Sequence, residues 1–376
     1  ARSLLYCRGH LLPRKLALIM MPSITMAAAL MSAALLILQA QSFAPPTSSL
    51  CYRSKVSPQL QQLKPKKSSY TTSLHLYNKF HEYAWEKLHY NDESSYASTV
   101  PDNLKTNKSP VKGSDNNVVT ACIRSMSEFR KSNTTSNNNV EALRLVRSAF
   151  LETQTESSEA LKSPMAIHVL NFVMFPTTHI RDASSGAPVG LPIFGADIVS
   201  LPGNKHLVAL DFQPVLPVNN DDESSTKLFP EQYSHLESKL LAIHGKYQKG
   251  SDEATEPLLA WGGDIPPQAL RWFSPYALWT RLSDENAIQT VSTTVWDAYR
   301  EYVDLYFELM DAVQEDLDDG KLEIILLEEK NNAVLSGQRE YLEYRRINDP
   351  ARPMLQRLYG KDWAEELIDG VLFPTL

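Results

Sequence analysis

Apolar and polar positions recur along this chain with two different periods, and the change of period predicts where helices give way to strands. Residues 75–90 (HLYNKFHEYAWEKLHY) place Leu76 and Phe80 on one face at helical spacing, which is typical of an amphipathic helix. A second amphipathic helix is predicted over residues 140–152. Residues 168–175 (HVLNFVMF) are almost continuously apolar and β-prone, so they predict a buried strand.

Two further strands are predicted over residues 189–201 and 206–214, joined by Pro202-Gly203-Asn204, a strong hairpin signal. The second half of the chain is predicted to be mainly helical. Its helices are expected over residues 231–245, 286–316 and 321–361, with an interruption at Asn348-Asp349-Pro350, because proline disfavours helical geometry in the residue before it. Strands followed by helices, without βαβ alternation, indicate an antiparallel sheet covered by helices.

Polar insertions interrupt this pattern. The stretches 91–139, 219–227 and 248–256 are rich in Ser, Asn, Asp, Lys and Glu, a composition that favours disorder or long loops. We therefore expect a single domain over residues 74–376 that carries three polar insertions.

Charge divides the chain into two unlike parts. Nine of the 37 Lys and Arg residues, and none of the 44 Asp and Glu residues, lie in residues 1–70, so the remainder carries 28 basic and 44 acidic side chains, a net charge of −16. An acidic body argues against nucleic acid as the main partner, because phosphate binding needs concentrated cations. Three cysteines cannot form a disulfide framework or a four-thiolate metal site.

The basic N-terminal part has the pattern of a targeting sequence. The apolar run 27–38 (AAALMSAALLIL) is too short to span a membrane, so residues 1–42 are predicted to be a signal peptide, and those before Met21 are candidates for a stretch that is not translated. Residues 43–73 are basic and hydroxyl-rich, as in transit peptides. The junction Ser42-Phe43-Ala44-Pro45 resembles that of the bipartite presequence of algae with secondary plastids. We expect delivery to the plastid (chloroplast stroma); the alternative is an ordinary secreted protein.

Common catalytic signatures are absent from the sequence. It contains no HExxH, CxxC or GxSxG motif and no glycine-rich phosphate loop, and Gly262-Gly263 lacks dinucleotide-binding spacing. The residues alone therefore indicate an enzyme or binding protein without a classical nucleotide or metal site.

Four blocks, in this order, resemble the ferredoxin-dependent bilin reductases. They are Leu170 to Pro176 (LNFVMFP), Pro192 to Asp197 (PIFGAD) with Leu210 to Pro214 (LDFQP), Phe273 to Arg281 (FSPYALWTR), and Asn348 to Pro353 (NDPARP) with Leu372-Phe373-Pro374. The resemblance runs from about Leu74 to Leu376, apart from the polar insertions.

The resemblance implies a three-layer α/β/α sandwich, with a central antiparallel sheet flanked by helices and an open-chain tetrapyrrole between the sheet and the C-terminal helices. It implies no bound cofactor and no metal: single electrons come from a reduced [2Fe–2S] ferredoxin, and the bilin itself carries the radical. We expect a monomer with no membrane partner, which hands bilin to or from a neighbouring bilin reductase or lyase.

The protein's share of such chemistry is proton delivery, which requires an acid that stays protonated near neutral pH. By resemblance, Asp197 is the central acid facing the pyrrole nitrogens, and Asp349 is the acid associated with A-ring reduction. Asn171 stands where the family's phycocyanobilin-forming member has a histidine. Because asparagine cannot titrate, this difference argues against that four-electron subgroup. Asp211 matches a family block, and we expect its role to be structural.

Candidate substrate-binding residues, besides Asn171, follow from the third and fourth blocks. Arg281, with Ser274 nearby, is predicted to hold a propionate, since arginine binds carboxylates through paired hydrogen bonds. Arg345 precedes Asp349 by four residues, one helical turn, so it is predicted to face the same pocket. The cluster Arg345, Arg346, Arg352, Arg357 and Lys361 is predicted to form the ferredoxin docking edge.

The stretch 262–267 (GGDIPP), running into Phe273 to Arg281, resembles most the family member that converts 15,16-dihydrobiliverdin to phycoerythrobilin by a two-electron reduction. Two alternatives remain within the family. One is the reduction of biliverdin to phytochromobilin, and the other is the reduction of biliverdin to 15,16-dihydrobiliverdin. A bilin lyase or bilin-binding carrier is the non-enzyme alternative; the presence of both Asp197 and Asp349 favours an enzyme.

Overall fold

The computed structural model describes residues 76–88, 100–110, 118–127, 142–154, 166–215, 228–249, 257–324 and 333–375. The predicted signal and transit segments, and the predicted insertion at 219–227, lie outside the described residues. Within the described ranges, no helix is long and apolar enough to cross a bilayer.

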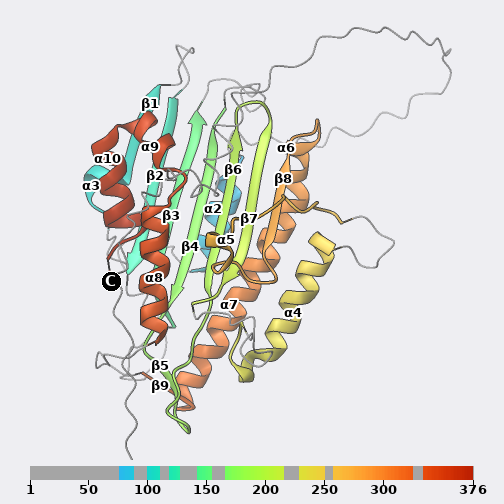
Figure 1. Ribbon diagram of the computed structural model, residues 1–376, viewed down its shortest axis with the longest axis vertical. Helices are drawn as coiled ribbons and strands as arrows, with labels where there is room; N and C mark the ends of the chain where they lie inside the picture. The colour runs from blue at the N-terminus through green and yellow to red at the C-terminus, as the bar shows by residue number, and fades with distance from the viewer. Residues whose placement is uncertain are drawn as a thin grey trace, which may run out of the picture.

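A seven-stranded antiparallel sheet forms the centre of the molecule, in the order β1-β2-β3-β4-β6-β7-β8 (Figure 1). Its strands are β1 Thr106–Pro110, β2 Val118–Ser127, β3 Leu143–Gln154, β4 His168–Pro176, β6 Ile193–Leu201, β7 Lys205–Gln213 and β8 Leu278–Leu282. A separate two-stranded sheet pairs β5 Ile180–Asp182 with β9 Leu322–Ile324. The mixed α/β fold with a central antiparallel sheet confirms the prediction.

Helices pack on both faces of the large sheet. They are α2 Asn78–Lys87, α3 Asp102–Lys105, α4 Ser234–His244, α5 Pro267–Leu270, α6 Ala287–Thr290, α7 Trp296–Asp318, α8 Ala333–Ile347, α9 Arg352–Tyr359 and α10 Lys361–Leu367. Short 3₁₀ or π turns occupy Glu231–Tyr233, Gly245–Lys249, Val291–Val295 and Ile368–Leu372. Helices α2, α4 and α7 contribute to one buried cluster, whereas α8, α9 and α10 contribute to another.

Residue parity decides which face of the sheet a side chain occupies. Side chains alternate along a strand, and every register pair between β4, β6 and β7 joins residues of like parity, such as Asn171 with Asp197. In these strands one face therefore carries the even-numbered residues and the other face the odd-numbered residues. The even face, with Phe172, Phe194 and Phe212, packs against α7. The odd face, with Val169 and Val199, belongs to the cluster that includes α8 to α10.

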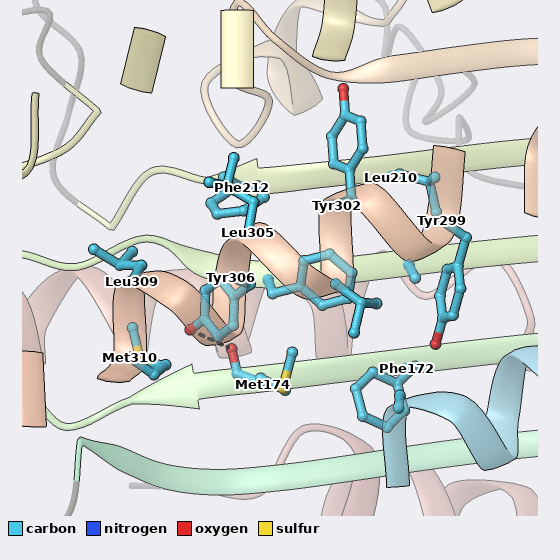
Figure 2. Close-up of a cluster of buried hydrophobic side chains, with 14 of the residues drawn as sticks. Phe172, Met174, Leu210, Phe212, Tyr299, Tyr302, Leu305, Tyr306, Leu309 and Met310 are labelled. Atoms are coloured by element: carbon cyan, nitrogen blue, oxygen red, sulfur yellow. Dashed lines mark hydrogen bonds between the residues drawn. The ribbon is translucent and has the colours of Figure 1, made fainter. Parts of the chain in front are cut away.

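The even face makes an aromatic core with α7 (Figure 2). Tyr306 is fully buried between Phe194 and Phe212, with ring centroids 5.4 and 5.3 Å away. Its hydroxyl donates to the carbonyl oxygen of Pro192 at 3.1 Å, so burial leaves no unmatched polar group there. This core fixes the strands that carry the candidate acids.

The β6–β7 hairpin forms as predicted, with Gly203 at φ +84° and Asn204 at φ +58° in its turn. Asparagine tolerates the left-handed region better than most residues with a side chain. The helices predicted over 75–90, 231–245 and 286–316 are also present as α2, α4 and α6–α7, and the predicted interruption at Asp349-Pro350 separates α8 from α9.

Three predictions about secondary structure were wrong. Residues 140–152 were expected to be helical but lie mostly in strand β3, whose two buried faces give an apolar run that resembles a helical pattern. The stretch 91–139 contains α3, β1 and β2, where Val119, Ala121 and Ile123 alternate with more exposed side chains. The helix expected from residue 321 is preceded by strand β9, Leu322–Ile324.

Candidate active site

The odd face of the sheet and the C-terminal helices enclose one pocket that brings together most of the predicted site residues. Its free space is about 1500 Å³, counting the part open to solvent. The walls are mainly apolar, as is usual for ligand pockets. Its polar and charged lining residues are Asn171, Asp197, Asp211, Gln213, Asp264, Arg281, Tyr341, Tyr344, Arg345 and Asp349.

Asp197 and Asn171 form the floor of the pocket. They are direct partners on β6 and β4, and Asn171 Nδ2 donates a short hydrogen bond to Asp197 Oδ1. Asn171 Oδ1 in turn accepts from Arg147 Nη1 at 3.0 Å. The Asp197 side chain keeps 35% of its surface exposed, so it is open to a ligand in the pocket.

Arg345 reaches the same carboxylate from helix α8. Its Nη2 lies 3.5 Å from Asp197 Oδ2, and its side chain is 11% exposed. Arg345 Nη1 also lies 3.5 Å from the hydroxyl of Tyr341, which donates to Gln213 Oε1 at 2.6 Å. The prediction that Arg345 faces the pocket of Asp349 agrees with this arrangement, although its partner here is Asp197.

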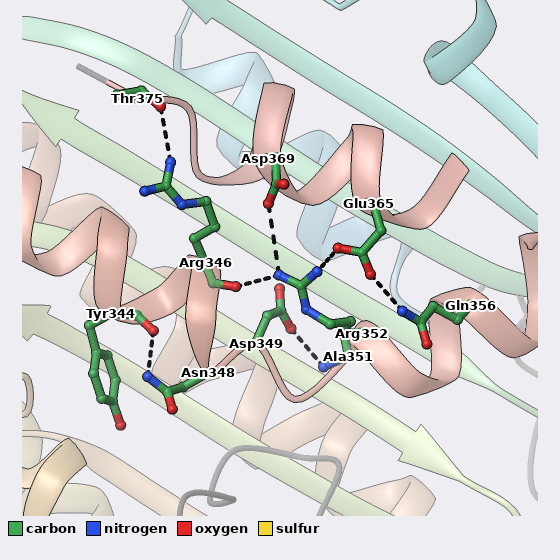
Figure 3. A network of polar contacts seen from close by, with 10 residues as sticks. All are labelled: Tyr344, Arg346, Asn348, Asp349, Ala351, Arg352, Gln356, Glu365, Asp369 and Thr375. Carbon is green, nitrogen blue, oxygen red and sulfur yellow. Dashed lines mark hydrogen bonds and ion pairs between the residues drawn. The ribbon is translucent and has the colours of Figure 1, made fainter. Parts of the chain in front are cut away.

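Asp349 lies just after α8 (Figure 3), and it is buried, at 6% exposed. Its Oδ1 accepts the backbone N–H of Ala351 at 2.6 Å, the turn that aspartate often makes before proline. Burial raises the pKa of the Asp349 carboxyl, and Arg345 and the Ala351 N–H oppose this in part. An acid with a raised pKa is suited to donate a proton.

Arg281 lies on β8 at the other end of the pocket. Its guanidinium lies 5.3 Å from the ring centre of Trp279, and among the described residues it has no ion-pair partner. Trp279 Nε1 donates to the carbonyl oxygen of Gly263 at 3.0 Å, and Gly262 packs so closely on the indole that an added Cβ would lie 2.8 Å from Nε1. The two glycines therefore let the backbone lie close to the Trp279 indole at Gly262 and to the Arg281 guanidinium at Gly263.

Ser274 does not line this pocket. Its N–H and its hydroxyl both donate to the carboxylate of Asp211, at 2.9 and 2.5 Å, and its own oxygen accepts the N–H of Tyr276. This position does not support the predicted contact between Ser274 and a propionate. Burial raises the pKa of Asp211 to about 7, with the two Ser274 bonds acting against it. Asp211 thus anchors the turn before β8 and also contributes to the pocket wall.

Two of the five residues of the predicted basic docking edge, Arg345 and Arg352, are paired with carboxylates. Arg352 pairs with Glu365 and lies 3.8 Å from Asp369, and it donates to the carbonyl oxygen of Arg346 (Figure 3). Arg345 is turned into the pocket. Arg357 and Lys361 are exposed. The edge therefore offers fewer free cations than the sequence indicates.

Sequence reasoning missed Arg147 and Tyr341, which support the pocket from β3 and α8. The signal for Arg147 was the presence of two arginines, Arg144 and Arg147, within the otherwise largely apolar run 143–151, but the run was interpreted as a helix. Of the described residues, no group of three or more His, Cys, Asp or Glu side chains is placed to hold a metal ion.

The fold agrees with one solved structure. The chain is similar to phytochromobilin synthase from tomato, solved in complex with biliverdin, with a TM-score of 0.50 and 22% identity over 79% of this chain and 82% of that one. At that identity the likeness establishes the fold class alone.

The family follows from the sequence comparisons. Residues 139–374 match the model of the ferredoxin-dependent bilin reductase family, and the chain belongs to this family. Its relatives include phycoerythrobilin:ferredoxin oxidoreductases of Prochlorococcus marinus (40% identical), Nostoc punctiforme (37%) and Parasynechococcus marenigrum (35%). The matches cover 55%, 55% and 62% of this chain. The same matches cover 66%, 66% and 71% of the three relatives. This chain therefore spans slightly less than two thirds of the length of the first two relatives.

Proposed function

We propose that this protein is an oxidoreductase that reduces 15,16-dihydrobiliverdin to phycoerythrobilin with electrons from reduced [2Fe–2S] ferredoxin. The observation that carries the proposal is that Asp197 and Asp349 line the same pocket in a member of the bilin reductase family. The relatives named as phycoerythrobilin:ferredoxin oxidoreductases support this substrate over others.

The reaction adds two electrons and two protons to the tetrapyrrole. Ferredoxin supplies the electrons one at a time, and each electron makes the bilin a stronger base. Asp349, buried with a raised pKa, donates one proton at the A-ring. Asp197 supplies the second, and its partner Arg345 stabilises the carboxylate that remains, since ion pairing favours the charged form.

In this proposal the bilin is bound by the apolar walls of the pocket and by the guanidinium of Arg281. The tetrapyrrole lies against the odd face of the sheet, where Val169, Val199 and Leu207 provide apolar contact. Arg281 holds a propionate, because its guanidinium has no acidic partner among the described residues and arginine binds carboxylates in a fork. In this proposal the chain acts as a monomer, and ferredoxin docks near the open side of the pocket.

The decisive experiment is an anaerobic assay with purified protein, reduced ferredoxin and each bilin in turn. We expect 15,16-dihydrobiliverdin to be converted to phycoerythrobilin, and biliverdin to be bound but left largely unreduced, as followed by absorption and product chromatography. Efficient use of biliverdin alone would instead identify one of the two biliverdin-reducing activities. Tight binding without any reduction would identify a carrier or lyase.

We also propose that residues 1–73 direct the protein to a plastid. Acid-free, basic composition after an apolar run supports this. A fluorescent protein fused to residues 1–73 should enter the plastid of an alga with secondary plastids. The Phe43→Ala variant should stop in the endomembrane system; secretion of the unchanged fusion would contradict the proposal.

A further inference from the structure

Arg147 is a fully buried cation that the proposed reaction does not yet use. It lies on β3, is 0% exposed, and stacks 4.5 Å from the ring centre of Phe373. Its Nη1 donates to Asn171 Oδ1 at 3.0 Å, whereas Nε and Nη2 have no hydrogen-bond partner in the described structure. Burying an arginine so incompletely matched is costly, so its one bond to the floor of the pocket calls for a function.

That bond fixes the orientation of the Asn171 amide. Arginine can only donate hydrogen bonds, so the oxygen of Asn171 must face Arg147, and its NH₂ group must face Asp197. Asp197 Oδ1 consequently accepts a hydrogen bond from Asn171. A proton on Oδ1 would displace this short hydrogen bond, whereas Oδ2 has only the longer contact with Arg345 Nη2 at 3.5 Å, so the arrangement favours Oδ2 as the oxygen that carries the proton.

We propose that Arg147 is a positioning residue that, through Asn171, reserves the Oδ2 oxygen of Asp197 for proton transfer to the bound tetrapyrrole. This inference rests on the proposed function. In the transfer the O–H bond at Oδ2 breaks and a bond to hydrogen forms on the bilin, while ferredoxin supplies the accompanying electron. The Asn171 hydrogen bond at Oδ1 stabilises the carboxylate that is left, and solvent returns the proton after product leaves.

Other groups also act on the Asp197 carboxylate, and the test has to separate their effects. Arg345 faces Oδ2 at 3.5 Å. The remaining titratable and charged groups that line the pocket are Asp211 from β7, Arg281 from β8, Tyr341 and Tyr344 from α8, Asp264 from the segment after Gly263, and Asp349. Arg147 hydrogen-bonds to none of these groups and contacts Asp197 only through Asn171, although its charge also acts on Asp197, Asp349, Tyr341 and Arg345.

Arg147→Met tests the inference by removing the donor and its charge at similar length. Infrared spectra of the protein with ¹³C-labelled aspartate, assigned with Asp197→Asn, report the pH at which the Asp197 carboxyl is half protonated. We expect that pH to rise in Arg147→Met, because a nearby positive charge is lost and the Asn171 amide is no longer held with its NH₂ group toward the Asp197 carboxylate. Arg147→Lys should reverse part of the rise. The basic limb of the turnover profile should move by the same amount.

The matched control is Arg144→Met, which removes the other arginine of β3, bound to Gln338 rather than to Asn171. This variant should leave the titration of Asp197 unchanged. If Arg147→Met does not fold, Asn171→Leu removes the mediator and should raise the midpoint in the same direction.

An Asp197 midpoint equal to that of the unchanged protein, in either folded variant, would overturn the inference. The infrared titration needs no turnover. A protein that binds bilin without reducing it would contradict the proposed function, while the titration would still decide the role of Arg147.

Discussion

Asn171 and Asp197 face each other across neighbouring strands, and the amide of Asn171 donates to Oδ1 of Asp197. Arg345 approaches the other oxygen, Oδ2, at 3.5 Å. The floor of the pocket therefore presents a carboxylate with two different oxygens, one held by the sheet and one shared with helix α8 and the pocket space.

Asp349→Asn should abolish product formation without preventing binding. The asparagine can still accept the Ala351 N–H that Asp349 accepts now, but it cannot donate a proton from a carboxyl. We expect turnover to fall about 10²- to 10⁴-fold, the usual contribution of a general acid, with the bilin Kd changed less than about threefold. Anaerobic turnover and absorption titrations measure the two quantities. Unchanged turnover would remove Asp349 from the mechanism.

Asp197→Asn should stop the reaction at an earlier stage. We expect bound substrate, or a one-electron-reduced bilin visible by electron paramagnetic resonance, to accumulate in place of product. Asp264→Asn is the control, because this exposed acid lines the same pocket without a proposed proton. Normal product formation by Asp197→Asn, or equal loss in both variants, would contradict the role given to Asp197.

Arg281→Met should weaken binding only of bilins whose propionates are ionised. Loss of one charge-assisted pair costs about 1.5–3 kcal/mol, a Kd increase of roughly 10- to 100-fold. The dimethyl ester of the same bilin should bind both proteins alike. Arg271→Met, which removes an exposed arginine paired with Glu340, should leave both affinities unchanged. Equal weakening for acid and ester would show that Arg281 acts by packing.

Gly337→Ala should destabilise the fold and disturb the site. An added Cβ would overlap the carbonyl oxygen of Val215, so helix α8, which carries Arg345, must move. We expect the free energy of unfolding to fall by about 1–3 kcal/mol, as for overpacking, measured by urea denaturation. Gly370→Ala is the control, since nothing lies within 4 Å of its added Cβ. Equal stability of both variants would contradict the close contact.

Because of Asp211, the free energy of unfolding should decrease as the pH rises over a defined range. Burial raises its pKa from 3.8 to about 7, so the folded state binds a proton that the unfolded state has already released between those values. The free energy of unfolding should fall relative to Asp211→Asn by about 1.4 kcal/mol per pH unit from pH ~4 to ~7, then level off. Urea denaturation of both proteins across this range measures the difference; parallel curves would contradict the raised pKa.

The sequence predicted the centre of the fold well because its signals there are local. The apolar run of β4 and the hairpin of β6 and β7 depend on neighbouring residues. It failed for β2 and β3, where pairing with distant strands, rather than local propensity, decides between helix and strand. Because β3 was predicted to be a helix, Arg147 was not recognised as a candidate site residue. Its position in the site depends on a hydrogen bond to Asn171 on the next strand.

The site was predicted in part, and mainly through the family resemblance. Asp197, Asp349, Asn171, Arg281 and Arg345 all line one pocket, yet their roles remain predictions. Ser274 was grouped with Arg281 because the two lie in the same sequence block, but Ser274 precedes β8, and its N–H and hydroxyl both donate to Asp211. Along a strand, the spacing of two residues specifies whether their side chains point to the same face. Along an irregular turn it does not.

The division of the sheet by residue parity also has a consequence for how this protein can evolve or be engineered. Substitutions at odd positions such as Val169, Val199 and Ala209 reshape the cavity wall while the even-numbered aromatic layer against α7 stays intact. Deleting one residue from β6 ahead of Asp197 would exchange the two faces of the strand. The architecture thus tolerates new substrate preferences through point changes and resists changes of strand length.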